Sequence, residues 1–175
     1  TDLTRVIQLD PKATVAFNNR ALAYLGLGKG AEAISDLTSS IALDPKDASA
    51  FATRGTAYIS TGDKEKALDY FLKAGEKAYK IYAPNEAFSY FQHALELQEE
   101  KGATLEEKAR MIERLGDLKA WMGESDACLE YWSKSLTLWD QLGDKKRVAS
   151  LHVKMANVLW DAIGDTKKAS EHHNA

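Results

Sequence analysis

Residues 9–45 read LDPKATVAFNNRALAYLGLGKGAEAISDLTSSIALDP. The tripeptide that opens this stretch, Leu9-Asp10-Pro11, also closes it as Leu43-Asp44-Pro45, at an offset of about 34 residues. Most residues that match at this offset are small or aromatic, the types that a packed interface constrains: Ala16/Ala50, Phe17/Phe51, Arg20/Arg54, Ala23/Ala57, Tyr24/Tyr58, Gly28/Gly62 and Ala33/Ala67. An internal repeat therefore organises the first half of the chain.

Each repeat unit has the pattern of two antiparallel helices. Phe17, Ala21 and Tyr24 form one stripe of a first helix, and Gly28 stands where that helix must end and the chain reverse. A second helix carries its apolar stripe on Ala33, Leu37, Ser40 and Ile41. The unit closes at Asp44-Pro45, because proline disfavours helical geometry in the residue before it.

This period and this placement of alanine, glycine, aromatic and proline residues resemble the tetratricopeptide repeat (TPR). The resemblance implies an all-α, right-handed superhelical solenoid of antiparallel helix pairs. We assign residues 1–83 to units of 34-residue period, with the chain starting inside a helix. A bundle with coincidental matches is the alternative that this spacing disfavours.

The second half changes period. The segment Ala67–Ala74 recurs as Ala87–Ala94, an offset of about 20 residues, which holds one helix and a turn. We therefore predict one long helix from about residue 64 to 82 that serves two neighbours, with Pro84 at the start of the next helix. Beyond it, Ala87, Cys128 and Ala169 are equally spaced, as are Gly123 and Gly164.

Residues 84–175 are accordingly predicted to form TPR-like helix pairs of about 41-residue period, continuous with the first half. Since the chain begins and ends within helical patterns, we expect it to be a fragment of a longer protein. The stretch from about residue 64 to 165 is similar to TPR-like arrays in multidomain signalling ATPases, cyclase-linked ATPases and maltose-type activators.

Charge and composition exclude several classes. With 23 Lys and Arg against 26 Asp and Glu, the net charge is −3, which disfavours nucleic-acid binding, including the helical-repeat RNA binders whose units have similar length. No apolar stretch approaches the roughly 18 residues of a membrane helix, so no membrane insertion is expected. A single cysteine gives no sign of an oxidising compartment, and we expect an intracellular, cytoplasmic protein.

No motif for catalysis, cofactor or metal binding stands out, so we predict a non-enzyme with no catalytic residue, cofactor or metal site. Cys128 replaces a helix-facing alanine and is expected to be a buried structural thiol. Trp121, Trp132, Trp139 and Trp160 are expected in helix–helix interfaces.

If the units stack, their first helices line a concave groove. Helical spacing places there two sets of residues: Asn18, Asn19, Leu22 and Leu25 from one unit, and Ser49, Ala52, Thr53 and Thr56 from the next. This surface is neutral and polar, and the asparagine amides are predicted to hydrogen-bond the backbone of an extended peptide. The alternative is that these are ordinary surface residues.

The resemblance to TPR domains also allows one subtype to be tested. Domains that bind the acidic tails of large heat-shock chaperones clamp them with lysine, arginine and asparagine. Asn19 matches the asparagine, but Ser49 and Thr53 stand where the lysine and arginine are due. A terminal carboxylate would lack its cations, so we predict no binding of chaperone tails.

The corresponding face of the second half is charged. Arg110 and Arg114 are predicted partner-binding residues, and they share this face with Glu113, Asp117 and, on the following helix, Lys154. The overall prediction is a scaffold that binds a protein or peptide segment in its groove. The alternative is an intramolecular regulatory or sensor arm of a multidomain signalling ATPase or cyclase, in which the partner is another domain of the same chain.

Overall fold

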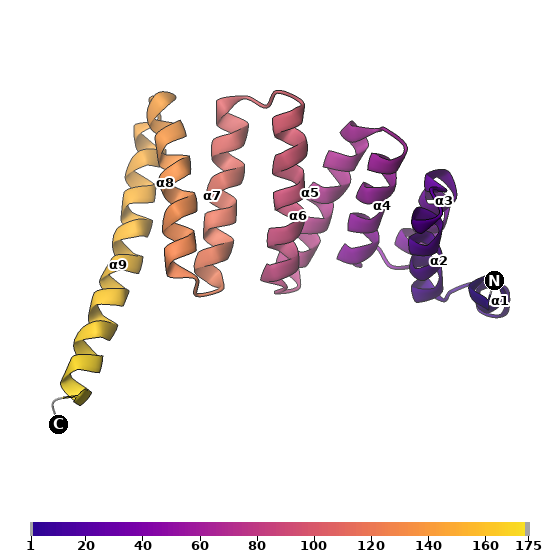
Figure 1. Ribbon diagram of the computed structural model, residues 1–175, viewed down its shortest axis with the longest axis horizontal. Coiled ribbons are helices and arrows are strands. Elements are labelled where there is room, and N and C mark those ends of the chain that lie inside the picture. Colours follow the sequence, from indigo (N-terminus) through magenta and orange to yellow (C-terminus); the bar gives the residue numbers. More distant parts are fainter. Residues whose placement is uncertain (1, 174–175) are drawn as a thin grey trace. The chain divides into compact units, whose positions relative to one another are not determined.

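The computed structural model describes the backbone of residues 2–173 and the side chains of residues 2–160. Within these residues the chain is helical and contains no strand, which confirms the all-α fold (Figure 1). The helices are α1 (Asp2–Leu9), α2 (Thr14–Gly26), α3 (Gly30–Leu43), α4 (Ala48–Ser60), α5 (Lys64–Lys80), α6 (Pro84–Glu100), α7 (Leu105–Trp121), α8 (Ser125–Gln141) and α9 (Lys145–His173).

Contacts group these helices into two compact units: unit 1, Thr1–Lys101, and unit 2, Gly102–Ala175. Unit 1 holds α1 to α6, and unit 2 holds α7 to α9. This grouping rests on packing, whereas the predicted division at residues 83 and 84 rests on repeat period. The division by period stays a prediction.

The turn after α2 confirms the predicted role of Gly28. This residue has a φ of 71°, in the left-handed region where an L side chain costs about 1–2 kcal/mol. The reversal lets the Lys29 amide donate to the Tyr24 carbonyl at 2.9 Å, which satisfies a carbonyl that the end of the helix leaves free. The chain can then return antiparallel as α3.

Small residues bring the helices of unit 1 close together. Ala21, Ala33, Leu37, Ala50 and Ala57, from α2, α3 and α4, are all fully buried in one cluster. Tyr24 packs against this cluster from α2. The stripes predicted for the first and second helices of the repeat therefore face each other, as the alanine positions indicated.

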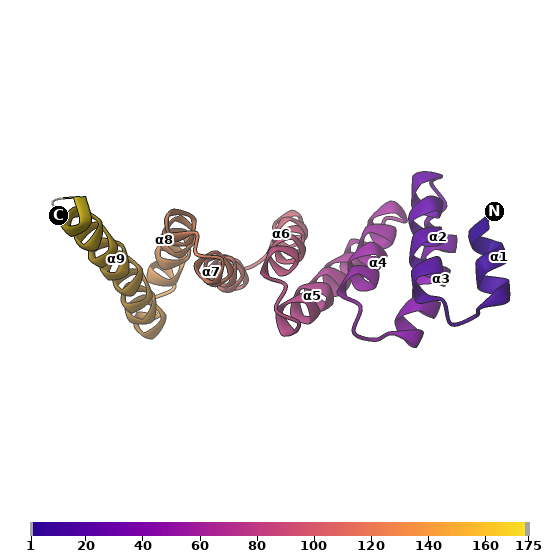
Figure 2. The same cartoon turned by 90° about the horizontal axis from the view of Figure 1, so that it is seen from below.

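The prediction of one long helix between two neighbours is confirmed by α5, which packs on both α4 and α6 (Figures 1 and 2). Its Phe71 covers Gly55 of α4, where an added Cβ would lie 3.0 Å from the ring. Its own Gly75 is covered by Phe91 of α6, and a Cβ there would lie 2.5 Å from that ring. Thus α5 is the second helix of one pair and the first helix of the next, and Pro84 begins α6 as predicted.

Unit 2 repeats the same contact with a larger side chain. Trp132 of α8 covers Gly116 of α7, where a Cβ would lie 2.5 Å from the indole. Cys128 is fully buried, and its thiol donates to the Ser125 carbonyl at 3.1 Å. Burial raises the pKa of the Cys128 thiol, so the sulfur stays protonated and unreactive, in line with its predicted structural role.

The prediction that all four tryptophans lie in helix–helix interfaces is wrong. Trp132 and Trp139 of α8 are buried between α7 and α9, but Trp121 is 42% exposed at the last position of α7 and Trp160 is 77% exposed on α9. Gly164, which shares the spacing of the turn residue Gly123, lies inside α9, which continues to His173. A glycine inside a helix costs only about 1 kcal/mol relative to alanine, and here no proline follows it. Ala169 lies outside the described side chains.

Candidate functional site

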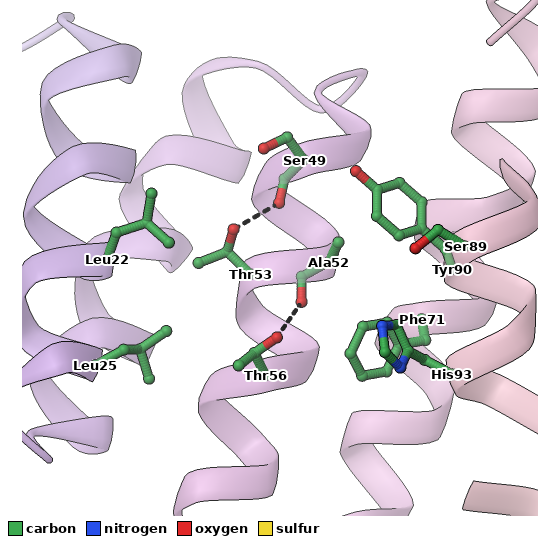
Figure 3. A pocket seen from close by; sticks show the side chains of 10 residues that line it. All are labelled: Leu22, Leu25, Ser49, Ala52, Thr53, Thr56, Phe71, Ser89, Tyr90 and His93. Atoms are coloured by element: carbon green, nitrogen blue, oxygen red, sulfur yellow. Dashed lines mark hydrogen bonds between the residues drawn. The ribbon is translucent and has the colours of Figure 1, made fainter. Parts of the chain in front are cut away.

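A hollow of about 220 Å³ opens on unit 1, lined by side chains from four helices (Figure 3). We call it the groove. Its walls come from α2, α4 and α6, with one side chain from α5. The lining residues are Leu22, Leu25, Ser49, Ala52, Thr53, Thr56, Phe71, Ser89, Tyr90 and His93.

The structure brings together most of the residues predicted for this surface. Leu22 and Leu25 of α2 lie across the groove from the α4 residues, which present one face of that helix (Figure 3). The α4 face consists of the four predicted residues Ser49, Ala52, Thr53 and Thr56. Leu22 is 54% exposed, so the groove offers solvent an apolar side chain.

The two predicted asparagines do not line this hollow. The Asn18 amide donates to the Asp47 carboxylate at 2.7 Å. The same carboxylate accepts the backbone amides of Ser49 and Ala50 and so caps the start of α4. Asn18 therefore joins α2 to α4, while Asn19 is exposed. Their predicted role in holding a peptide backbone stays a prediction.

Sequence reasoning missed the wall that α6 contributes, with Ser89, Tyr90 and His93, and it missed Phe71. The Phe71 and His93 rings lie 5.1 Å apart between centroids. The signal was present in the recurrence of Ala67–Ala74 as Ala87–Ala94. Since α5 acts as a first helix toward α6, the array steps by a single helix there, and α6 takes a place beside the groove.

The chemistry of the groove is that of neutral hydroxyls and apolar groups. Thr53 and Thr56 donate their hydroxyl hydrogens to carbonyls of their own helix, at 2.9 and 3.3 Å, which leaves their oxygens as acceptors. Burial raises the pKa of the Tyr90 phenol, with smaller effects from Glu86 and Asp47. Tyr90 is therefore a protonated hydrogen-bond donor at neutral pH.

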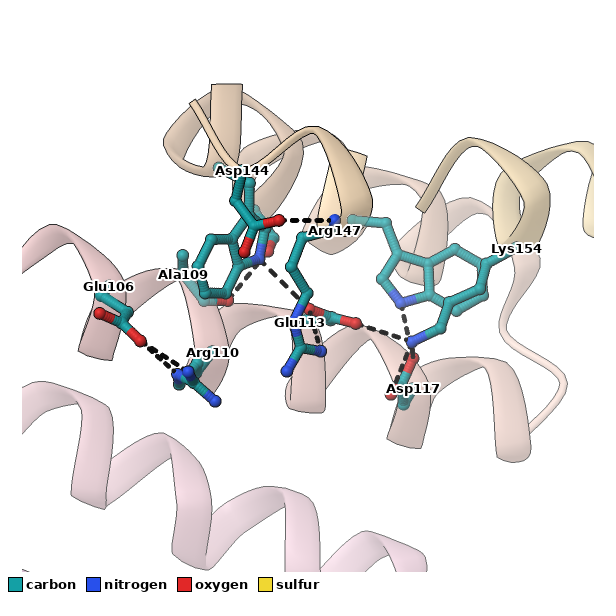
Figure 4. Close-up of polar contacts among 11 residues, drawn as sticks. Glu106, Ala109, Arg110, Glu113, Asp117, Asp144, Arg147 and Lys154 are labelled. Carbon is teal, nitrogen blue, oxygen red and sulfur yellow. Dashed lines mark hydrogen bonds and ion pairs between the residues drawn. The ribbon is translucent and has the colours of Figure 1, made fainter. Parts of the chain in front are cut away.

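On unit 2, the predicted charged face surrounds a second hollow of about 430 Å³. It is lined by Arg110, Glu113, Arg114, Asp117 and Arg147. Lys154 of α9 lies 2.9 Å from Glu113 and 2.7 Å from Asp117, and Figure 4 shows it reaching both carboxylates. The residues predicted to share this face are thus brought together.

Many of these charges are paired within the protein. Glu113 is buried, accepts the Trp139 indole hydrogen at 3.2 Å and lies 3.5 Å from Arg147. Burial lowers the pKa of Lys154, but hydrogen bonds to Asp117 and Glu113 outweigh it and raise that pKa. Arg110 is paired with Glu106 at 2.6 Å, although both side chains are exposed. Binding of a partner by Arg110 and Arg114 stays a prediction.

The described residues contain no candidate metal site and no candidate membrane-spanning helix. No group of three or more His, Cys, Asp or Glu side chains is placed to hold a metal ion in that part of the chain. Over the same residues, no helix combines the length and the apolar character needed to cross a bilayer.

In the family comparison, residues 15–47 and 48–74 each match the tetratricopeptide repeat. A search of curated proteins gave no match. The matched residues cover α2 to the middle of α5, where the sequence shows its 34-residue period.

Several solved structures are similar to this chain. BtubC from P. vanneervenii is 12% identical, with a TM-score of 0.54 over 86% of this chain and 65% of that chain. YrrB, described as a TPR protein with an unusual peptide-binding site, is 18% identical with a TM-score of 0.42 over 95% and 98% of the two chains. TTC0263, a thermophilic TPR protein in Thermus thermophilus, is 20% identical, with a TM-score of 0.39 over 90% and 87%. The likeness to BtubC, at 12% identity, concerns the fold alone.

Proposed function

The chain carries two tetratricopeptide repeats, at residues 15–47 and 48–74, and from this premise we propose that it is a non-catalytic scaffold whose groove binds an extended segment of a partner protein. The observation that carries the proposal is the hollow between α2, α4 and α6. It joins the exposed face of three helices in one concave surface, the shape in which repeat proteins hold an extended chain.

The lining suits a peptide backbone with small or apolar side chains. Leu22, Leu25 and Phe71 supply apolar surface, and the threonine oxygens and the Tyr90 hydroxyl supply acceptors and a donor. The lining includes no aspartate, glutamate, lysine or arginine. We therefore expect an affinity that varies little with ionic strength, in contrast to a charged interface.

The test uses peptides selected by phage display against the protein and measures their affinity for two variants by calorimetry. Thr53→Glu places a charged side chain in the groove and is expected to weaken binding at least about tenfold, equivalent to about 1.4 kcal/mol. Thr38→Glu is the matched control. Thr38 is also a helical threonine bonded to its own backbone, at 2.6 Å, but it is exposed on α3 and does not line the groove.

Selected peptides that bind Thr53→Glu as tightly as the unmodified protein would show that the groove is the wrong surface. The chemistry of the groove is the same whether the segment comes from another protein or from another domain of one longer chain. In the second case the protein acts as a regulatory arm, and the same variant would release the arm from that domain.

A further inference from the structure

The turn between α5 and α6 differs from the other tight turns of the fold. The turns after α2, α4, α6, α7 and α8 each place a glycine in the left-handed region, at φ values from 71° to 83°. At the corresponding place after α5 stands Tyr82, with a φ of 60°. An L residue costs about 1–2 kcal/mol in this conformation, so this turn carries a strain that glycine would remove.

Packing in the core does not account for the tyrosine. Tyr82 is 81% exposed, and its neighbours Ile81 and Tyr79 are 58% and 48% exposed. Three large apolar side chains thus face solvent at one end of α5. Tyrosine is enriched among the residues that dominate binding energy at protein interfaces, because it buries a large area with few rotatable bonds.

Beside this turn lies a hollow of about 400 Å³ lined by Lys46, Lys77, Lys80 and Ile81. Lys77 is already engaged, since its ammonium donates to the Pro45 carbonyl and lies 4.4 Å from the centroid of the Phe51 ring. Lys46 and Lys80 form no ion pair with any described side chain. Acidic side chains lie nearby: Glu76 precedes Lys77 in α5, and Asp44, Asp47 and Glu86 line an adjoining hollow. Asp44 and Asp47 accept backbone amides at the start of α4 and in the turn before it.

Lysines in the last turn of a helix commonly complement its dipole, which accounts for Lys77 and Lys80. It does not account for Lys46, which comes from the turn between α3 and α4. Positive charge from two turns therefore converges on an apolar floor, next to a strained and exposed aromatic residue.

We propose that this corner of unit 1, formed by Lys46, Lys77, Lys80, Ile81 and Tyr82, is a docking site for an acidic protein segment that carries an apolar side chain. The carboxylates of the segment pair with Lys46 and Lys80, and its apolar side chain enters the hollow over Ile81. Tyr82 covers the segment from the side. This site is separate from the groove and does not depend on what the groove binds.

The probe is a fluorescein-labelled peptide of alternating glutamate and leucine, titrated into the full chain and followed by anisotropy. Two control peptides replace all glutamates by glutamine or all leucines by alanine. The site requires both chemistries, so each control peptide is expected to bind at least about tenfold more weakly. Amide shifts in NMR spectra should move at residues 79–82 and at Lys46. Equal binding of the glutamine peptide, or shifts confined to other residues, would overturn the proposal.

Two variants complete the test. Replacing Lys46 and Lys80 together by glutamine is expected to weaken binding of the glutamate–leucine peptide about tenfold. The same change at the exposed Lys29 and Lys146 is expected to leave its affinity unchanged. Tyr82→Gly is expected to raise the melting temperature, because glycine relieves the strain of the positive φ. The same change is expected to weaken binding of the peptide at least about tenfold, because it removes the aromatic side chain. If Tyr82 had only a structural role, its replacement would not raise the stability of the protein and lower its affinity for the peptide at the same time. Undiminished affinity of Tyr82→Gly would contradict the proposal.

Discussion

At the scale of single residues, the contact that builds this protein is a large ring lying on a glycine. It occurs between Phe71 and Gly55, and again between Phe91 and Gly75. In unit 2 it occurs between Trp132 and Gly116. Because the glycine has no Cβ, the ring approaches the partner helix backbone closely, and the two helices pack at short range. Glycine has a low helix propensity, but at these positions the close approach of the ring requires a residue without a Cβ.

Gly75→Ala is expected to lower the free energy of unfolding by about 1–3 kcal/mol, because its Cβ would lie 2.5 Å from the Phe91 ring, which is fully buried and has no room to move. Gly26→Ala is the control: Gly26 is also helical, but nothing lies within 4 Å of the new methyl group. This change is expected to stabilise by up to about 1 kcal/mol. Urea denaturation followed by circular dichroism measures both, and equal effects would refute the packing argument.

At the scale of elements, the structure shows two ways of joining helices. In unit 1, α5 is shared between two pairs, so the array advances by one helix instead of two. In unit 2, polar contacts link α7 to α9 through Lys154, Glu113 and Asp117. The second arrangement places a carboxylate, Glu113, in the interior, where its charge is tolerated only because it is paired.

Lys154→Met is expected to destabilise unit 2 by about 2 kcal/mol, since it leaves the buried Glu113 carboxylate without its closest cation. Lys134→Met removes an exposed ion pair with Glu130, and we expect a much smaller loss of stability because solvent screens exposed ion pairs. Tryptophan fluorescence in urea compares the two variants. If the two substitutions cost the same, the buried carboxylate does not depend on Lys154.

At the scale of the whole molecule, the packing falls into two units, and each helix contacts mainly its neighbours in sequence. Repeat proteins of this kind unfold by regions, because few contacts connect distant parts. All four tryptophans belong to unit 2, whereas the helical signal comes from both units. The two signals therefore report different parts of the chain.

We accordingly expect Gly75→Ala to lower the unfolding midpoint seen by far-ultraviolet circular dichroism while leaving the midpoint of tryptophan fluorescence nearly unchanged. Lys154→Met should shift the fluorescence midpoint. Thermal or urea titrations with both probes on the same samples make the measurement. Coincident shifts of both probes in each variant would mean that the chain unfolds as one cooperative body, against the expectation for two units.

The sequence by itself determined the helices, the turns and the pairing of helices in unit 1. These features depend on local spacing: alanine at 34-residue intervals, glycine at Gly28 and proline at Pro84 each act on their own neighbours. It also placed Thr53 and its neighbours on α4 along one face, because helical geometry fixes which residues share a face.

Only the tertiary structure decided what that face meets. Tyr90 and His93 line the groove because α6 packs on α5, the helix that is shared between two pairs. Asn18 does not line the groove, and its amide donates a hydrogen bond to Asp47. Trp160 is exposed and Trp132 buried, although both are tryptophans on amphipathic helices. Such outcomes depend on contacts between residues far apart in the chain, and the free energy of those contacts is not encoded in local periodicity.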